Sequence, residues 1–413
     1  MKFWFIGLGA LLLFQFGGIE PASSSTGLVP ECGSLTPGLA SQIDLSTAAM
    51  TPSGSVYSFA DGSYTVASFD GAIVKTVVQK NLTSRMPFPA VAATNGNVWS
   101  AGSHDLAIVS PRGVLKTIPL DSTINPQALA ADSMGNAWIL SRGTSLGDYL
   151  IEVSPQGLVT LKRNLQSYGL RSTALSVGED DSIWVTFASV SDTPGGAIGH
   201  FEKNGASELY PIPFHGYPTE AVTAGSSLMF ATLGNLVNNA AAVSIGIVKR
   251  DGSITQEHLM DWGFGNGNGL LLPHLTSDGL GGAFFAGKNI SVSGAIRSFT
   301  GLGFSTRTLV GTKNQVWSGN TVFRIDTCPF LQTSIPKVKT ASKSRVAIAD
   351  TGIWDDGVGI RYQWLRDGKT IKGANQAGYS ASKSDRKHQI SLEVTAFKFG
   401  FTTQTFVSNK VKI

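Results

Sequence analysis

Two segments of the sequence gather the side chains that could do chemistry. Residues 211–220 and 261–274 together contain Phe214, His215, Tyr217, Glu220, Trp262, Phe264 and His274. Imidazole and carboxylate groups can act as acids and bases or bind a metal ion, and aromatic faces suit sugar rings or other flat ligands. Spacing alone does not bring the three titratable residues together. We therefore predict a ligand site, with acid–base or metal chemistry and ordinary packing as the alternatives.

Other kinds of site are excluded or disfavoured. The sequence contains no P-loop, no HExxH motif and no GxSxG motif. Nucleic-acid binding is not expected, because residues 1–335 hold 18 Lys or Arg against 22 Asp or Glu. We predict no resident cofactor, no metal ligands and a monomer.

The elements that must position these segments are repeated. A unit of four short apolar runs recurs seven times, and residues 128–165 and 174–214 are two consecutive copies. The second run of each copy carries a bulky anchor, which falls at Tyr57, Trp99, Trp138, Trp184, Phe230, Phe284 and Trp317. Four strands repeated at this period are typical of a propeller blade. The sequence therefore predicts an all-β, seven-bladed β-propeller rather than a β-sandwich.

A turn signal supports the repeat. An X-Gly pair separates the third run from the fourth in five copies, at Asp70-Gly71, Arg112-Gly113, Gln156-Gly157, Asn204-Gly205 and Asp251-Gly252. Glycine adopts positive φ without steric cost, so we expect two-residue hairpins at these positions.

The ends of the repeat array predict how the ring closes. The seventh copy lacks a fourth strand, and residues 39–45 read as a strand that precedes the first copy. We expect residues 39–45 to form the outer strand of the last blade, because closure removes exposed strand edges. Cys32 and Cys328 flank that junction and are predicted to form a disulfide; two buried free thiols are the alternative.

The chain ends predict further segments. Residues 1–24 have one Lys before a short apolar stretch and small residues near Ser24, which indicates a secretory signal peptide rather than a membrane span. Residues 25–332 would then be the propeller, exported to an oxidising compartment. Residues 336–413 contain 14 Lys or Arg against 6 Asp or Glu, a balance of +8 that could tether the protein to an anionic cell envelope. An inert spacer with a solvated surface is the alternative.

Residues 333–413 are predicted to form a small β-sandwich. Alternating apolar residues and frequent turn signals support this prediction. The stretch 362–369, Tyr-Gln-Trp-Leu-Arg-Asp-Gly-Lys, resembles the central strand of Ig-like modules of secreted Gram-positive bacterial proteins. Tyr379 and Asp385 match the later part of that pattern, whereas Arg386-Lys387-His388 replaces its usual glycine. Trp364 is expected to be a core residue.

The blade sequences resemble a known family. Over about residues 45–327 they are similar to the streptogramin (virginiamycin B) lyases and to the wider NHL and SMP-30-like propellers. The matching phrases are Asn97-Val98-Trp99-Ser100, Asn136-Ala137-Trp138-Ile139 and Ser182-Ile183-Trp184-Val185-Thr186. The resemblance implies a metal held by His and Glu on the channel face. The Glu that commonly follows the Trp strand in the lyases is replaced here by Ala101, by Leu140 or Ser141, and by Phe187.

Two functions follow as expectations. The first is a secreted, envelope-associated propeller that binds a carbohydrate or another envelope polymer through the loops 211–220 and 261–274. The second is a lyase-like or hydrolase-like enzyme at the channel mouth, which would bring a divalent metal ion.

Overall fold

The computed structural model describes most of the chain from Cys32 onward. The described residues are 32–79, 82, 89–143, 147–165, 170–178, 180–190, 195–203, 205–213, 216–224, 227–237, 240–249, 252–263, 274–299, 302, 307–311, 314–330, 335–340, 346–350, 354, 358–371, 374 and 377–412. The predicted signal peptide, residues 1–24, lies outside them. Within the described part, no helix has the length and apolar character needed to cross a membrane.

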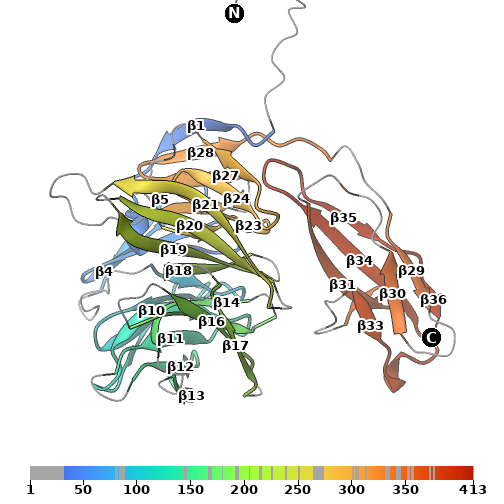
Figure 1. The fold of residues 1–413 in the computed structure, drawn as a ribbon, viewed down its shortest axis with the longest axis horizontal. Coiled ribbons are helices and arrows are strands. Elements are labelled where there is room, and N and C mark those ends of the chain that lie inside the picture. The colour runs from blue at the N-terminus through green and yellow to red at the C-terminus, as the bar shows by residue number, and fades with distance from the viewer. Residues whose placement is uncertain are drawn as a thin grey trace, which may run out of the picture. The chain divides into compact units, whose positions relative to one another are not determined.

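The repeat forms four-stranded antiparallel sheets, each with its strands in chain order (Figure 1). The first sheet consists of β2 (Ala48–Met50), β3 (Val56–Ala60), β4 (Ser63–Ala67) and β5 (Ile73–Val78). The second consists of β6 (Val91–Ala92), β7 (Val98–Ala101), β8 (Asp105–Val109) and β9 (Leu115–Pro119). The third consists of β10 (Pro126–Ala131), β11 (Ala137–Ser141), β12 (Tyr149–Val153) and β13 (Val159–Asn164).

Three more sheets follow the same order. The fourth consists of β14 (Arg171–Val177), β15 (Ile183–Ala188), β16 (Gly196–Phe201) and β17 (Ser207–Pro211). The fifth has longer strands, β18 (Tyr217–Ala224), β19 (Ser227–Val237), β20 (Ala240–Val248) and β21 (Ile254–Gly263). The sixth consists of β22 (Thr276–Ser277), β23 (Gly282–Phe285), β24 (Lys288–Ser291) and β25 (Ile296–Ser298).

The seventh sheet joins the two ends of the array. It consists of β26 (Thr308–Gly311), β27 (Gln315–Ser318), β28 (Thr321–Ile325) and, at its outer edge, β1 (Leu35–Ala40). With this sheet the described residues form seven four-stranded sheets, which confirms the predicted seven-bladed β-propeller.

The position of the closing strand differs from the prediction of residues 39–45. Residues 35–40 pair with β28, and the strand then ends. The side chain of Asp44 accepts a hydrogen bond from the backbone N–H of Ser46 and caps the 3-10 helix η1 (Leu45–Thr47). The apolar residues Ile43 and Leu45 looked like strand positions, but they are buried between the seventh and first sheets.

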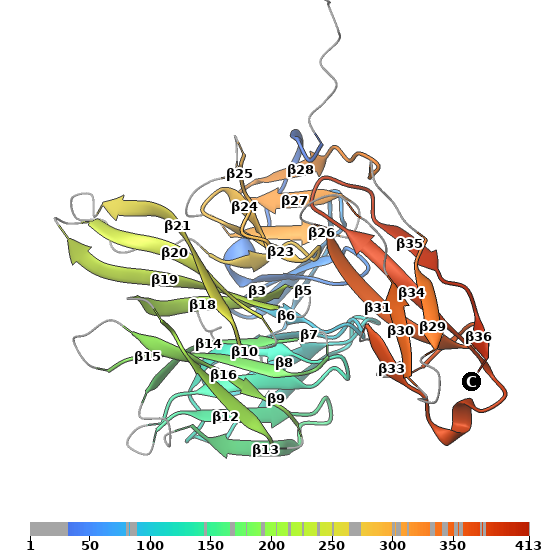
Figure 2. The same ribbon diagram turned by 45° about the vertical axis from the view of Figure 1, so that its right-hand side comes forward.

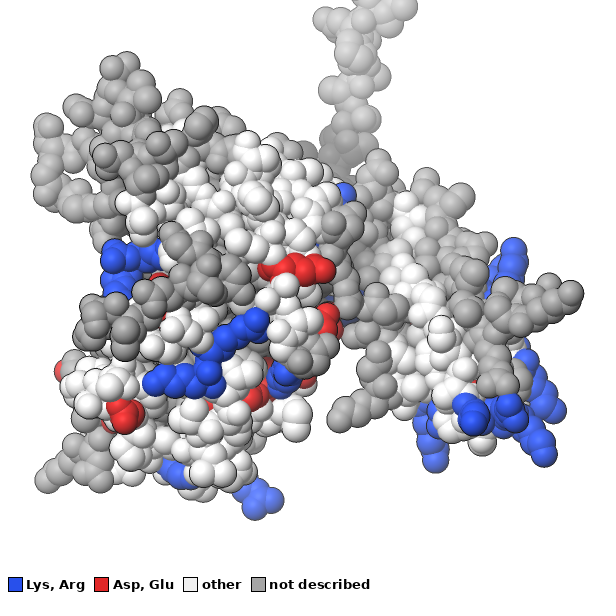
Figure 3. All heavy atoms as spheres, turned by 60° about the horizontal axis from the view of Figure 1, so that its bottom comes forward, with Lys and Arg blue, Asp and Glu red and all other residues white. Residues whose placement is uncertain are grey.

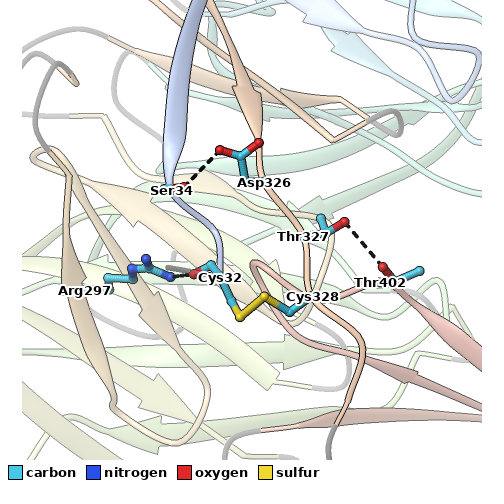
Figure 4. The surroundings of a disulfide bond; sticks show 7 residues. All are labelled: Cys32, Ser34, Arg297, Asp326, Thr327, Cys328 and Thr402. Carbon is cyan, nitrogen blue, oxygen red and sulfur yellow. Dashed lines mark hydrogen bonds between the residues drawn. A yellow bond between two sulfur atoms is a disulfide. The ribbon is translucent and has the colours of Figure 1, made fainter. Parts of the chain in front are cut away.

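The predicted disulfide is present beside this closing strand. Cys32 and Cys328 are bonded, with their Cα atoms 5.3 Å apart (Figure 4). Arg297 donates a hydrogen bond to the carbonyl oxygen of Cys32, and Asp326 accepts one from Ser34 at 3.0 Å. The bond therefore lies where the first and last strands of the propeller meet.

The hairpins between the third and fourth strands are longer than predicted. Each glycine of the X-Gly pairs does have positive φ, from 76° at Gly113 to 96° at Gly71. However, five residues, not two, separate β4 from β5: Ser68 donates to the carbonyl of Ala72, and Gly71 donates to that of Ser68. The same turn recurs in the following blades, because a positive-φ glycine also suits a type I turn that ends in a bulge.

Apolar clusters fill the spaces between neighbouring sheets. Six of the seven anchors pack toward the following sheet; for example, Trp138 contacts the cluster of the fourth sheet. Phe230 is buried but packs toward the preceding sheet, and Met229 takes the anchor position of the fifth sheet. A Cβ added to Gly246 would overlap the ring of Phe230, so this glycine makes room for the reversed aromatic side chain.

The described strands within residues 337–412, which we call the C-terminal module, form two further sheets (Figure 2). One sheet has the order β29 (Lys337–Thr340), β30 (Val346–Asp350) and β33 (Gly378–Ser380). The other contains β32 (Lys369–Thr370), β31 (Gly359–Arg366), β34 (Gln389–Phe397), β35 (Gln404–Val407) and β36 (Val411–Lys412), and the 3-10 helix η3 (Lys383–Asp385) precedes β34.

The core of this C-terminal module lies between its two sheets. Trp364 of β31 is fully buried and stacks on Tyr379 of β33, with 5.5 Å between ring centroids. Trp364 is thus a core residue, as expected. An Ig-like identity for the module remains a prediction.

The module also contacts the propeller. Cys328 exchanges backbone hydrogen bonds with the segment after β34, at Gly400 and Thr402. Phe399 of the same segment packs edge-on against Phe284 of the sixth sheet, with 5.1 Å between ring centroids.

Candidate functional site

The innermost strands of the seven sheets surround a central channel. A cavity of about 500 Å³ opens there, and residues of all seven blades line it. Most of its wall is made of small apolar and hydroxyl side chains, such as Ala90, Leu129 and Thr173. Charged groups are few, and their positions define the candidate site.

One layer of the channel carries these charges. The residues that stand ten positions before the seven predicted anchors are, in blade order, Thr47, Pro89, Ala128, Ala174, Glu220, His274 and Arg307. All except Thr47 line the cavity. The strand pairing supports their equivalence, because in three consecutive blades the residue follows a β-bulge: Ala128 pairs with Leu140, Ala174 with Thr186, and Glu220 with Ala231. The layer is uncharged in blades one to four and charged in blades five to seven.

Glu220 and His274 form a hydrogen-bonded pair in this layer. Glu220 Oε1 and His274 Nδ1 are 2.8 Å apart, and the backbone N–H of Leu275 donates to Glu220 Oε2. Both carboxylate oxygens are therefore held. An ionised Glu220 favours the tautomer with a proton on Nδ1, which leaves Nε2 as the nitrogen able to accept a proton or a hydrogen bond. The side chain of Glu220 is 29% exposed and that of His274 is 38% exposed, so solvent and ligands can reach both.

Arg307 brings a positive charge to the same layer. Its guanidinium donates to the backbone carbonyls of Leu45, at 3.1 Å, and Ala48, and so links the seventh blade to the first. Burial lowers the pKa of Arg307 to about 10, and the negative charge of Glu220 opposes this shift. The guanidinium thus remains charged at neutral pH and attracts the carboxylate of Glu220.

The predicted site residues have different outcomes. The structure brings Glu220 and His274 together, although 54 residues separate them in sequence. Tyr217 is the first residue of β18 and is half-buried. Trp262 lies in β21, and its side chain is outside the described part. Phe214, His215 and Phe264 are outside the described residues.

The two segments are also less loop-like than predicted. Residues 217–220 belong to β18, and residues 261–263 extend β21 because Trp262 pairs with Ala241 of β20. Part of the long step between the fifth and sixth anchors is therefore strand. Sequence reasoning missed Arg307, which the ten-residue offset from Trp317 would have found.

The described residues do not fit a metal centre. In the part of the chain that the structure covers, no three His, Cys, Asp or Glu side chains are placed to hold a metal ion. Glu220 and His274 supply only two ligands and lie in one layer with a charged guanidinium, which would repel a divalent cation.

The fold and this channel layer define the protein as a seven-bladed β-propeller with a one-sided charged site. No protein-family model matches the chain, and no curated protein is similar to it in sequence. Its fold is similar to that of a streptogramin B lyase, at 17% identity and a TM-score of 0.51, over 71% of this chain and 97% of the lyase.

A second similar structure is a catalytically inactive virginiamycin B lyase from Staphylococcus aureus with quinupristin. It is 16% identical, with a TM-score of 0.51, over 70% of this chain and 98% of that protein. The resemblance to lyase-type propellers is thus confirmed for the fold, and at these identities it establishes the fold alone.

Proposed function

We propose that this protein is a binding propeller that holds a small ligand in its channel at the layer of Glu220, His274 and Arg307. The observation that carries the proposal is the confinement of charge to three adjacent blades around a cavity of about 500 Å³. Cavities of this size accept small organic molecules, and a few converging polar groups fix their orientation.

The two sides of the layer favour an amphiphilic ligand. Ala128 and Ala174 offer apolar surface on one side. On the other side, Nε2 of His274 favours a hydrogen-bond donor such as a hydroxyl group, and the guanidinium of Arg307 favours an oxygen acceptor such as a carbonyl group. Aromatic side chains of the flanking segments, Phe214, Tyr217, Trp262 and Phe264, would supply stacking surface for a sugar or another ring. His215 would add a further polar contact.

Lyase-like chemistry is the second candidate, and the Glu220–His274 pair is the observation that favours it. A carboxylate that orients an imidazole is a common arrangement for a general base. The fold neighbours bear the names streptogramin B lyase and virginiamycin B lyase, so quinupristin is a reasonable probe of such activity.

The location of the protein belongs to the proposal as well. The apolar stretch within residues 1–24 and the Cys32–Cys328 disulfide support secretion, since disulfides persist in oxidising compartments. The basic C-terminal module, which we propose to be Ig-like, would retain the propeller at the cell envelope.

The test compares channel variants with a matched control. Oligosaccharides and quinupristin are screened for binding to the native protein by calorimetry, and each binder is repeated with His274→Ala and Glu220→Gln. The exposed His104→Ala, in the second blade, is the control for loss of an imidazole. We expect at least a tenfold loss of affinity in both channel variants and none in the control.

One result would count against the channel site, and a further variant tests the flanking segments. Unchanged affinity of every binder in His274→Ala would place binding elsewhere. Loss of binding in Trp262→Ala/Phe264→Ala with unchanged thermal unfolding would support the flanking segments, whereas unfolding with retained binding would make them packing elements. For the enzymatic candidate, mass spectrometry after incubation distinguishes a lyase, which adds no water, from a hydrolase, which adds one.

A further inference from the structure

Two short strands of the C-terminal module have the same sequence pattern and lie side by side. Lys337-Val338-Lys339 lies in β29. In the second pattern, Lys410 directly precedes β36, and Val411 and Lys412 form it. Asn409 joins them, because its side chain accepts from the N–H of Val338 at 2.8 Å and donates to the carbonyl of Val338 at 3.0 Å.

Strand alternation sends the four lysines to the surface. Val338 is 3% exposed, and both valines pack in the core cluster around Trp364. Lys337, Lys339, Lys410 and Lys412 are all exposed. Residues two apart on a strand are separated by about 7 Å, so two charges per strand form a compact cationic patch, which we call the lysine strip.

Neighbouring turns extend the positive surface. Lys412 pairs with Gln389, which follows the exposed residues Arg386 and Lys387. Figure 3 shows Lys and Arg side chains gathered on this module. Within the described residues, none of the lysines of the strip forms an ion pair.

One acidic residue, Asp350, lies opposite Lys337 in the β29–β30 pairing, and two further acidic residues near the strip have partners of their own. Asp385 is fully buried and paired with Arg366, at 2.5 Å. Asp367 is paired with His388 and also accepts a hydrogen bond from the backbone N–H of Gln389. The four lysines therefore outnumber Asp350, and the strip keeps a net positive charge that a partner can bind.

We propose that the lysine strip binds a linear phosphodiester polymer of the cell envelope. Lysine ammonium groups bind phosphate as point charges and need no fixed orientation, which suits a flexible polymer with regularly spaced phosphates. In the described part of the module the Trp, Tyr and Phe side chains are buried or half-buried, and the exposed ring of His388 is paired with Asp367. This disfavours base stacking on single-stranded nucleic acid and aromatic anchoring in a membrane.

This inference names the partner for the envelope retention proposed above and does not depend on the channel ligand. The test uses the full secreted chain, with purified poly(glycerol phosphate) as the probe. The variant is Lys337→Gln/Lys339→Gln/Lys410→Gln/Lys412→Gln. The matched control removes four charges from exposed positions of the propeller: Lys75→Gln/Arg112→Gln/Lys162→Gln/Lys249→Gln.

The native protein should bind the polymer, with affinity falling on the order of 50-fold between 50 and 200 mM salt if about four phosphates are neutralised. The strip variant should bind the polymer at least tenfold more weakly at low salt, and its affinity should depend little on salt. The control variant should keep the native affinity and the native salt dependence. An equal loss of affinity in the two variants would show that binding depends on the net charge of the protein and not on the strip, and would overturn the proposal. Preferred binding to anionic vesicles or to DNA, or no binding to the polymer, would also overturn it. His274→Ala should bind the polymer normally, which separates this result from the channel test.

Discussion

Removal of the disulfide is the perturbation for which the structure gives the clearest magnitude. Cys32 and Cys328 are 296 residues apart, so their bond closes almost the whole propeller into one loop. In the chain-entropy model, removal of a cross-link that closes a loop of this length increases the conformational entropy of the unfolded chain and stabilises the unfolded state by about 5–6 kcal/mol. We therefore expect Cys32→Ser/Cys328→Ser to lose up to about 5 kcal/mol of stability.

The variant should still fold. The pairing of β1 with β28 runs from Leu35 opposite Ile325 to Ala40 opposite Thr321 and does not involve the cysteines. Asp326 continues to accept hydrogen bonds from Ser34 and Thr36. Because each kcal/mol shifts the unfolding temperature of a domain of roughly this size by about 2–4 °C, the loss should lower that temperature by about 10–20 °C.

Differential scanning calorimetry of the native protein and the double variant, with and without reductant, measures the effect. Reductant should shift the native protein to the temperature of the variant and leave the variant unchanged. Each single variant, Cys32→Ser or Cys328→Ser, should match the double variant, since either one removes the bond. A decrease smaller than about 3 °C would refute the reasoning and show that the β1–β28 ladder alone closes the ring.

The remaining predictions concern the module core and a blade interface. Burial alone would raise the pKa of Asp385, but hydrogen bonds from Ser382, Tyr379 and Arg366 lower that pKa to about 2. The ionised carboxylate therefore stabilises the fold by about 2 kcal/mol above pH 4, and this contribution is lost as the pH falls toward 2. Hydrogen exchange of β31 and β34 should show Asp385→Asn weakened at pH 6 and equal to the native protein near pH 2; equal protection at pH 6 would contradict this. Gly246→Ala should destabilise the fifth blade by about 1–3 kcal/mol in urea unfolding, because the new methyl group meets the ring of Phe230. Phe230→Leu in the same chain should recover part of the loss, and no recovery would show that the strain lies elsewhere.

The blade count could be predicted because the repeat appears in the sequence as bulky residues at similar intervals. Details depended on features that the repeat does not encode. Phe230 matched the anchor spacing, yet its ring faces the opposite way, because Glu220 pairs with Ala231 and this register gives the anchor position to Met229. Gly246 opposite Phe230 leaves space for the ring. The closing strand was misplaced because Ile43 and Leu45 alternate like strand residues, while Asp44 between them ends the strand by capping a helical turn.

Two of the three charged residues of the channel site could be found from composition, and the third required the register of the copies. Glu220 and His274 stood out because they are titratable residues near aromatic ones. Arg307 has no such neighbours and becomes visible only when the copies are aligned on their anchors. Convergence of the three follows from ring closure, a tertiary event that spacing along the chain does not reveal.

The ring also explains why a similar fold does not settle the function. Seven blades provide seven equivalent positions in each channel layer, and a propeller gains a site where some blades depart from the others. Here the layer carries Glu220, His274 and Arg307 on one side and uncharged side chains such as Ala128 and Ala174 on the other. Likeness to the lyases indicates a shared scaffold, whereas the chemistry depends on these three residues. If lyase-type substrates fail to bind, the same asymmetry still predicts an amphiphilic ligand, because polar and apolar walls face each other across one cavity.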